Sequence, residues 1–160
     1  MLAFNAGVSV AADLNLGGFD SHENNDVQQE SLLDELTDGI DYLWEFAEET
    51  GIADRLMVIV GSDFSRTPYY NSGDGKDHWP IGSYLIMEKG VDYTNRFIDG
   101  TDELQEAVKI DPNSLTPSGF GAKILTSHVH EALREYLNLT DSSITQLFPF
   151  NNAEKFNFFG

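Results

Sequence analysis

Five residues in three short segments have side chains of the kind that bind divalent metal ions. Carboxylate oxygens and imidazole nitrogens together suit Zn²⁺, Mn²⁺ or Fe²⁺. Each segment lies close to an apolar run of the chain. We therefore predict a divalent metal site, with Zn²⁺ as the first choice and Mn²⁺, Fe²⁺ or Ca²⁺ as alternatives. The candidate ligands are Asp20, His22, Asp63, Asp77 and His78.

Each of these residues also has an ordinary explanation. A single aspartate after a strand more often caps a helix or closes a turn, and a single histidine is more often a hydrogen-bonded polar residue than a ligand. Their joint occurrence beside successive apolar runs favours a shared site. Arg66 is the candidate catalytic residue. Its planar guanidinium either holds a tetrahedral oxyanion or pairs with one of the many carboxylates, and both roles stay open.

The elements that must position these residues alternate along the chain. We predict strands over residues 8–16, 56–61 and 82–87. Between the first two we predict a helix over 28–49, because its apolar residues recur at three- and four-residue steps. Strand, helix and strand form a βαβ unit with a right-handed crossover. The predicted fold class is α/β, a mostly parallel sheet flanked by helices, with ligands bound beyond the carboxyl ends of the strands.

The second half of the chain carries a further helix and an aromatic tail. The helix is predicted over residues 122–137, where His128 and His130 are two residues apart and so point to different faces. We expect these histidines to be structural or solvated. The phenylalanine-rich tail over 148–160 either packs on the domain or forms half of an interface. With no repeat and no low-complexity linker, the expected organisation is one domain over residues 1–160.

The composition is strongly acidic. The 160 residues include 27 Asp and Glu against 9 Lys and Arg, a formal net charge of −18, which excludes nucleic-acid binding through a general basic surface. No apolar run approaches the about 18–20 residues of a membrane span, and the first residues lack the positive charge of a secretory signal. The chain has no cysteine, so disulfides and thiolate chemistry are excluded. We expect neither nucleic acid nor membrane as a partner.

Three motifs in order make the chain resemble a known family. They are GGFDSH from Gly17, SDFSRTP from Ser62 and GKDH from Gly75. This resembles the sulfatase-like family called domain of unknown function 1501, which shows Gly-Gly-Trp/Phe-Asp-Thr/Ser-His, Ser-Glu-Phe-Gly-Arg-Thr and Gly-x-Asp-His. Asp63 stands where the family usually has Glu, and Ser65 where it usually has Gly. The resemblance covers residues 6–87 and, more faintly, the helix to residue 137.

The resemblance implies a fold and an activity. The family is grouped with the alkaline-phosphatase-like superfamily, whose members hydrolyse or transfer phosphate and sulfate esters at a two-metal site in an α/β sheet. By motif, Asp20, His22 and His78 correspond to ligands of one metal and Asp63 to a ligand of the second. The related nucleophile comes from an N-terminal half, so we expect a C-terminal portion that is incomplete or inactive alone. Its expected partners are that missing half or further copies of the chain.

Two other functions stay open from the sequence. The first is a non-catalytic binding or assembly module derived from the same fold, and the second is a generic acidic Ca²⁺ binder. The family resemblance implies an exported or periplasmic protein, although the chain shows no signal peptide.

Overall fold

The computed structural model describes residues 1–98 and 100–160, which form two compact units, residues 1–91 and 92–160. The expectation of one domain over the whole chain stays a prediction. Of the described residues, no helix is both long and apolar enough to cross a membrane. All of the candidate ligands belong to the first unit, which is described first.

The first unit is dominated by the long helix α2, Asn25–Glu49. The predicted helix over 28–49 is therefore confirmed, and it begins three residues earlier than expected. Its apolar stripe is less exposed than the acidic residues around it, as the three- and four-residue spacing predicts. At its end Ala47 packs with Ile52 and Ala53 against the short helix α1, Leu2–Asn5, and beside the 3-10 turn η1, Ala53–Arg55.

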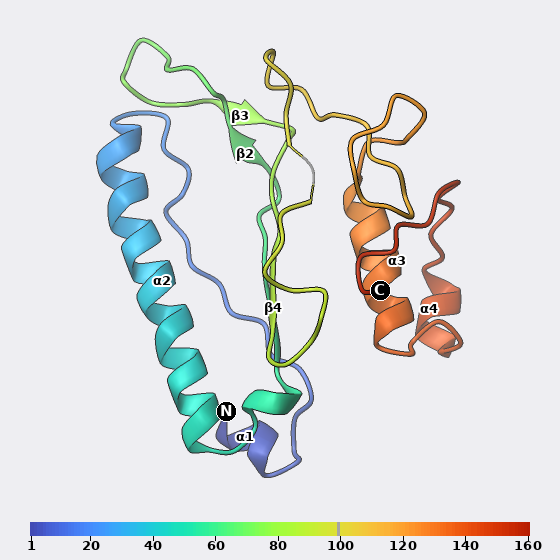
Figure 1. Cartoon of the computed structure of the whole chain (residues 1–160). Helices are drawn as coiled ribbons and strands as arrows, with labels where there is room; N and C mark the ends of the chain where they lie inside the picture. Colours follow the sequence, from blue (N-terminus) through green and yellow to red (C-terminus); the bar gives the residue numbers. More distant parts are fainter. Residues whose placement is uncertain (99) are drawn as a thin grey trace. The chain divides into compact units, whose positions relative to one another are not determined.

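The strands of the first unit pair in two separate antiparallel ribbons (Figure 1). β1, Met57–Val60, pairs with β4, Leu85–Glu88. β2, Ser65–Arg66, pairs with β3, His78–Trp79. The predicted strands over 56–61 and 82–87 are thus found within a few residues of their expected bounds. The predicted mostly parallel sheet flanked by helices is wrong, because both ribbons are antiparallel and have two strands each.

The predicted strand over residues 8–16 is also wrong. This segment has no strand pairing, and Val8, Val10 and Leu14 are largely exposed. It runs along α2 in the opposite direction to the helix (Figure 1). β-branched residues favour an extended chain, but a strand also requires a partner edge, and no such edge pairs with this segment among residues 1–98 and 100–160. Without this strand, the described part of the chain contains no βαβ unit and no crossover.

The second unit is built on α3, Thr126–Tyr136, with the short helix α4, Ser143–Leu147. The helix predicted over 122–137 is found here, although it begins four residues later. Ile110 and Leu133 are buried, and Phe156 and Phe158 from the aromatic tail are buried and stacked with ring centroids 5.3 Å apart. His128 is buried as well, and its Nδ1 accepts the Leu125 N–H at 3.0 Å.

Candidate metal centre

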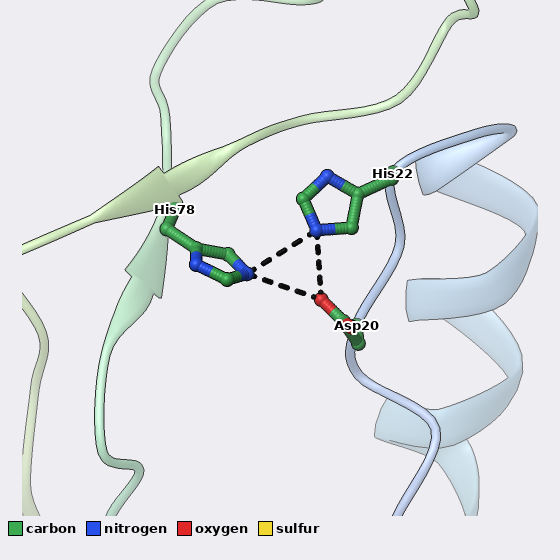
Figure 2. A group of neighbouring side chains, drawn as sticks. All are labelled: Asp20, His22 and His78. Carbon is green, nitrogen blue, oxygen red and sulfur yellow. Dashed lines mark hydrogen bonds and ion pairs between the residues drawn. The ribbon is translucent and has the colours of Figure 1, made fainter.

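Three of the predicted ligands converge in the first unit. Asp20 and His22 lie just before α2, and His78 lies on β3 (Figure 2). The Asp20 Oδ1 atom is 3.0 Å from His22 Nε2 and 3.3 Å from His78 Nε2. The two Nε2 atoms are 3.2 Å apart. Each side chain therefore contributes one potential ligand atom to a nearly equilateral triangle.

The size of this triangle suits a divalent metal. Zn²⁺ binds imidazole nitrogen and carboxylate oxygen at about 2.0–2.1 Å, so tetrahedral ligand atoms lie about 3.3 Å apart. The observed separations of 3.0–3.3 Å match that spacing. A carboxylate only accepts hydrogen bonds when ionised, and a neutral imidazole has one lone pair. The donor set of two nitrogens and one oxygen therefore fits a transition metal in composition and in spacing.

Asp20 and His22 are exposed on either side of a buried residue. Ser21 between them is completely buried, and its hydroxyl donates to Asn25 Oδ1 at 2.7 Å. Gln29 on α2 donates to the Ser21 hydroxyl at 2.9 Å and to the Phe19 carbonyl at 3.0 Å. These bonds hold Ser21 inside the unit, while Asp20 and His22 on either side of it stay exposed and converge with His78.

The β2–β3 ribbon brings His78 to the same place. The Thr67 N–H donates to the Asp77 carbonyl at 2.9 Å, and the Lys76 N–H donates to the Ser21 carbonyl at 3.0 Å. The second bond ties the ribbon directly to the segment that carries Asp20 and His22. The Phe64 ring packs on the His78 ring with centroids 4.2 Å apart. No pattern in the sequence predicts this contact of Phe64.

Arg66 is the least exposed charged residue of the site, with 12% of its side chain accessible. Its Nε donates to the Phe19 carbonyl at 3.2 Å and its Nη1 to the Lys76 carbonyl at 3.0 Å. Its Nη2 forms an ion pair with Asp20. The hydrogen bond from Arg66 to Asp20 lowers the pKa of that carboxyl most, and the hydrogen bond from His78 lowers it further. Of the two roles open to Arg66, the structure shows the ion pair with a carboxylate. The role of holding an oxyanion stays a prediction.

The other two predicted ligands lie outside the triangle. Asp77 Oδ1 is 3.1 Å from His22 Nδ1, the ring nitrogen that faces away from the cluster, and accepts from Asn71 Nδ2 at 3.2 Å. The hydrogen bonds from His22 and then Asn71 lower the pKa of Asp77. Asp63 is exposed and is not among the ligand atoms brought together in the described part of the chain. Their roles as ligands stay predictions.

Sequence reasoning missed Asn71, Ser21 and Gln29 as supports of the site. Asn71 opens the polar segment over residues 71–77, which resembles a calcium loop only weakly. It holds that segment through its amide and donates to the His22 carbonyl at 3.0 Å. Ser21 is part of the GGFDSH motif, but nothing in the sequence shows that its hydroxyl is buried.

A second polar pair beside the site gives a pH prediction. Tyr70 donates its hydroxyl to Asp26 at 2.7 Å, which lowers the pKa of Asp26, and the same contact raises the pKa of Tyr70. Asp26 therefore stabilises the fold above its ordinary pKa of 3.8, and this contribution is lost as pH falls through its lowered pKa. We expect Tyr70→Phe to raise the pKa of Asp26 toward its ordinary value in a carboxyl-carbon NMR titration.

The control for that prediction is Tyr69→Phe, which removes a neighbouring phenol whose ring packs edge-on against Trp79. It should leave the pKa of Asp26 unchanged. The stability difference between wild type and Tyr70→Phe should be larger at neutral pH than at about pH 2. Equal differences at both pH values would contradict the assigned pair.

The comparisons with known proteins identify a family. No curated protein and no solved structure gives a significant match to the chain. The sequence profile of one family, described as Protein of unknown function (DUF1501), matches residues 3–130. The matched range includes the three motifs and every residue of the triangle. Since it covers well over half of the 160 residues, the chain belongs to the DUF1501 family.

Proposed function

We propose that the chain carries a divalent metal centre, with Zn²⁺ as the preferred ion, that serves the hydrolysis of phosphate or sulfate esters. The observation that carries the proposal is the triangle formed by Asp20, His22 and His78. Three protein ligands leave at least one coordination position for water or substrate, which is typical of catalytic rather than structural zinc sites. We infer phosphate or sulfate esters as the substrate class from the proposed placement of the family in the alkaline-phosphatase-like superfamily.

The exposure of the site favours a reaction on a ligand that arrives from solvent. The side chains of Asp20, His22 and His78 are 67%, 46% and 56% accessible. A bound metal would polarise an ester oxygen and lower the pKa of a coordinated water. The chain itself would hold the ion through the two Nε2 atoms and Asp20. Arg66 would keep Asp20 ionised and add positive charge where negative charge develops.

The attacking group is proposed to be water or a nucleophile from outside the described site. Two of the hydroxyls next to the site residues in sequence already make hydrogen bonds within the chain. Ser21 is buried and donates to Asn25, and Thr67 is buried and donates to the Tyr69 carbonyl at 2.8 Å. We therefore expect slow turnover by this chain alone, and faster turnover if a partner protein or another copy of the chain supplies the nucleophile.

A non-catalytic module is the second candidate function, and the contacts of Arg66 favour it. The Arg66 Nη1 atom is 3.4 Å from His22 Nε2, while Nη2 pairs with Asp20. A guanidinium in this place partly neutralises the cluster without a metal. In that case the cluster would serve only to join the segment before α2 to the β2–β3 ribbon.

Titration of metal-free protein with Zn²⁺, Mn²⁺ and Ca²⁺ by calorimetry separates these candidates. We expect one Zn²⁺ per chain, weaker Mn²⁺ binding and little heat with Ca²⁺, followed by Zn²⁺-dependent release of p-nitrophenol from its phosphate or sulfate ester. One Zn²⁺ per chain without turnover would support a metal-binding module. No heat with any ion would reject the metal centre and leave the purely structural cluster.

A further inference from the structure

We propose that Asp77 is a positioning residue that holds the proton of His22 on Nδ1, so that the Nε2 lone pair faces the Asp20 and His78 ligand atoms. This inference rests on the proposed metal centre. Asp77 was expected to be a metal ligand itself. In this proposal it is instead the hydrogen-bond partner of a ligand, His22. Histidine ligands commonly donate their second N–H to a carboxylate, which fixes the tautomer and the ring orientation.

The contacts of Asp77 support this role. Its Oδ1 atom is 3.1 Å from His22 Nδ1, on the side of the ring opposite the cluster. The peptide groups of Asp77 are fixed too, since its N–H donates to the Thr67 hydroxyl at 3.2 Å and its carbonyl accepts the Thr67 N–H at 2.9 Å. The carboxylate is therefore held at Nδ1 by the β2–β3 ribbon.

Asn71 orients the Asp77 carboxylate from the other side. Its Oδ1 accepts the N–H groups of Gly73 and Gly75 at 2.9 Å and 3.1 Å. These two donors fix which end of the amide is oxygen, so Nδ2 must point the other way. It donates to Asp77 Oδ1 at 3.2 Å and to the His22 carbonyl at 3.0 Å. One amide thus ties the carboxylate to the residue whose ring it orients.

The surroundings of His22 Nε2 favour a lone pair there rather than a proton. Arg66 Nη1, which can only donate, lies 3.4 Å from this nitrogen. Asp20 Oδ1, the acceptor nearest to Nε2 at 3.0 Å, already accepts from Arg66 Nη2 and also lies 3.3 Å from His78 Nε2. A proton on Nε2 would face the guanidinium donor, whereas a lone pair accepts from it. The Nδ1–H tautomer satisfies both sides of the ring.

Two-bond ¹H–¹⁵N spectra of the metal-free protein test the tautomer directly. At about pH 9 we expect His22 to carry its proton on Nδ1. Asp77→Ala should lose this preference, and Asp77→Asn should retain it because the amide oxygen can still accept. Zn²⁺ affinity should fall about 10–100-fold in Asp77→Ala and less in Asp77→Asn, with one ion per chain retained.

Asp74→Asn is the matched control, since it removes one negative charge from the same loop. Asp74 has a φ of 54°, a conformation that asparagine tolerates. We expect this variant to keep the wild-type tautomer and Zn²⁺ affinity. A His22 protonated on Nε2 in the wild type, or an unchanged tautomer in Asp77→Ala, would overturn the inference. A wild type with the Nδ1–H tautomer that binds no Zn²⁺ would instead overturn the proposed metal centre.

Discussion

Replacing His78 with alanine should weaken Zn²⁺ binding by more than about 100-fold, beyond the range expected for loss of an outer hydrogen-bond partner. The variant removes one of the three ligand atoms. Asp20 Oδ1 and His22 Nε2, which lie 3.0 Å apart, would then be the two remaining ligands of the triangle. The chain should still fold, because the His78 side chain is 56% accessible and buries little surface. Calorimetry or competition with a chromogenic chelator measures the affinity.

Two further variants make this result specific to the triangle. His130→Ala removes an exposed histidine of α3, in the other unit, and should leave the affinity unchanged. Asp63→Ala tests the predicted second-metal ligand, whose carboxylate is not part of the triangle. It should also leave the first Zn²⁺ in place. Loss of binding in His130→Ala equal to that in His78→Ala would show that zinc binds to surface histidines in general.

Replacing Gly75 with alanine should damage both the fold of the first unit and the site. A Cβ atom at this position would lie 1.9 Å from the His22 carbonyl oxygen and 2.4 Å from the Glu23 nitrogen. Both are backbone atoms, so no rotamer change can relieve the clash. The loop must then move away from the segment before α2. We expect a loss of about 1–3 kcal/mol in the free energy of unfolding, measured by urea denaturation.

The same loop provides the control for Gly75. A Cβ at Gly73 would come no closer than 3.4 Å, and the atom it meets is the flexible Glu23 Cγ. Gly73→Ala should therefore be neutral or slightly stabilising, by up to about 1 kcal/mol. Zn²⁺ affinity should fall in Gly75→Ala, because the Lys76 N–H bond to the Ser21 carbonyl holds His78 beside His22. Equal stability of the two variants would contradict the close approach.

Local sequence patterns were enough to place several elements of this fold. The three- and four-residue spacing of Leu36, Ile40 and Leu43 depends only on neighbouring turns of a helix, and α2 was found where the spacing predicted it. The same holds for α3 and for the apolar runs that contain β1 and β4. These patterns depend on residues close together in the sequence, so they predict an element independently of how the rest of the chain folds.

Such local patterns could not predict whether the strands pair in parallel or antiparallel. An apolar run such as β1 fits a strand buried on two faces in either a parallel or an antiparallel sheet. Which edge it meets depends on the path of the intervening loop, and here the chain turns back through β2 and β3 before it reaches β4. The segment over 8–16 has strand-forming residues but no partner edge in the described structure, so its side chains stay exposed.

By itself the sequence determined which residue types are available for a site and that three of them sit in recognisable motifs. Only the tertiary structure decided which atoms meet. His22 and His78 are far apart in the chain, yet a buried Ser21 and the Lys76 bond to its carbonyl bring their Nε2 atoms to 3.2 Å. Asp77, next to His78 in sequence, reaches the opposite nitrogen of His22 instead. Asp77 directly precedes β3, and adjacency in the motif does not say to which side each side chain points, so it could not decide which of them joins the cluster.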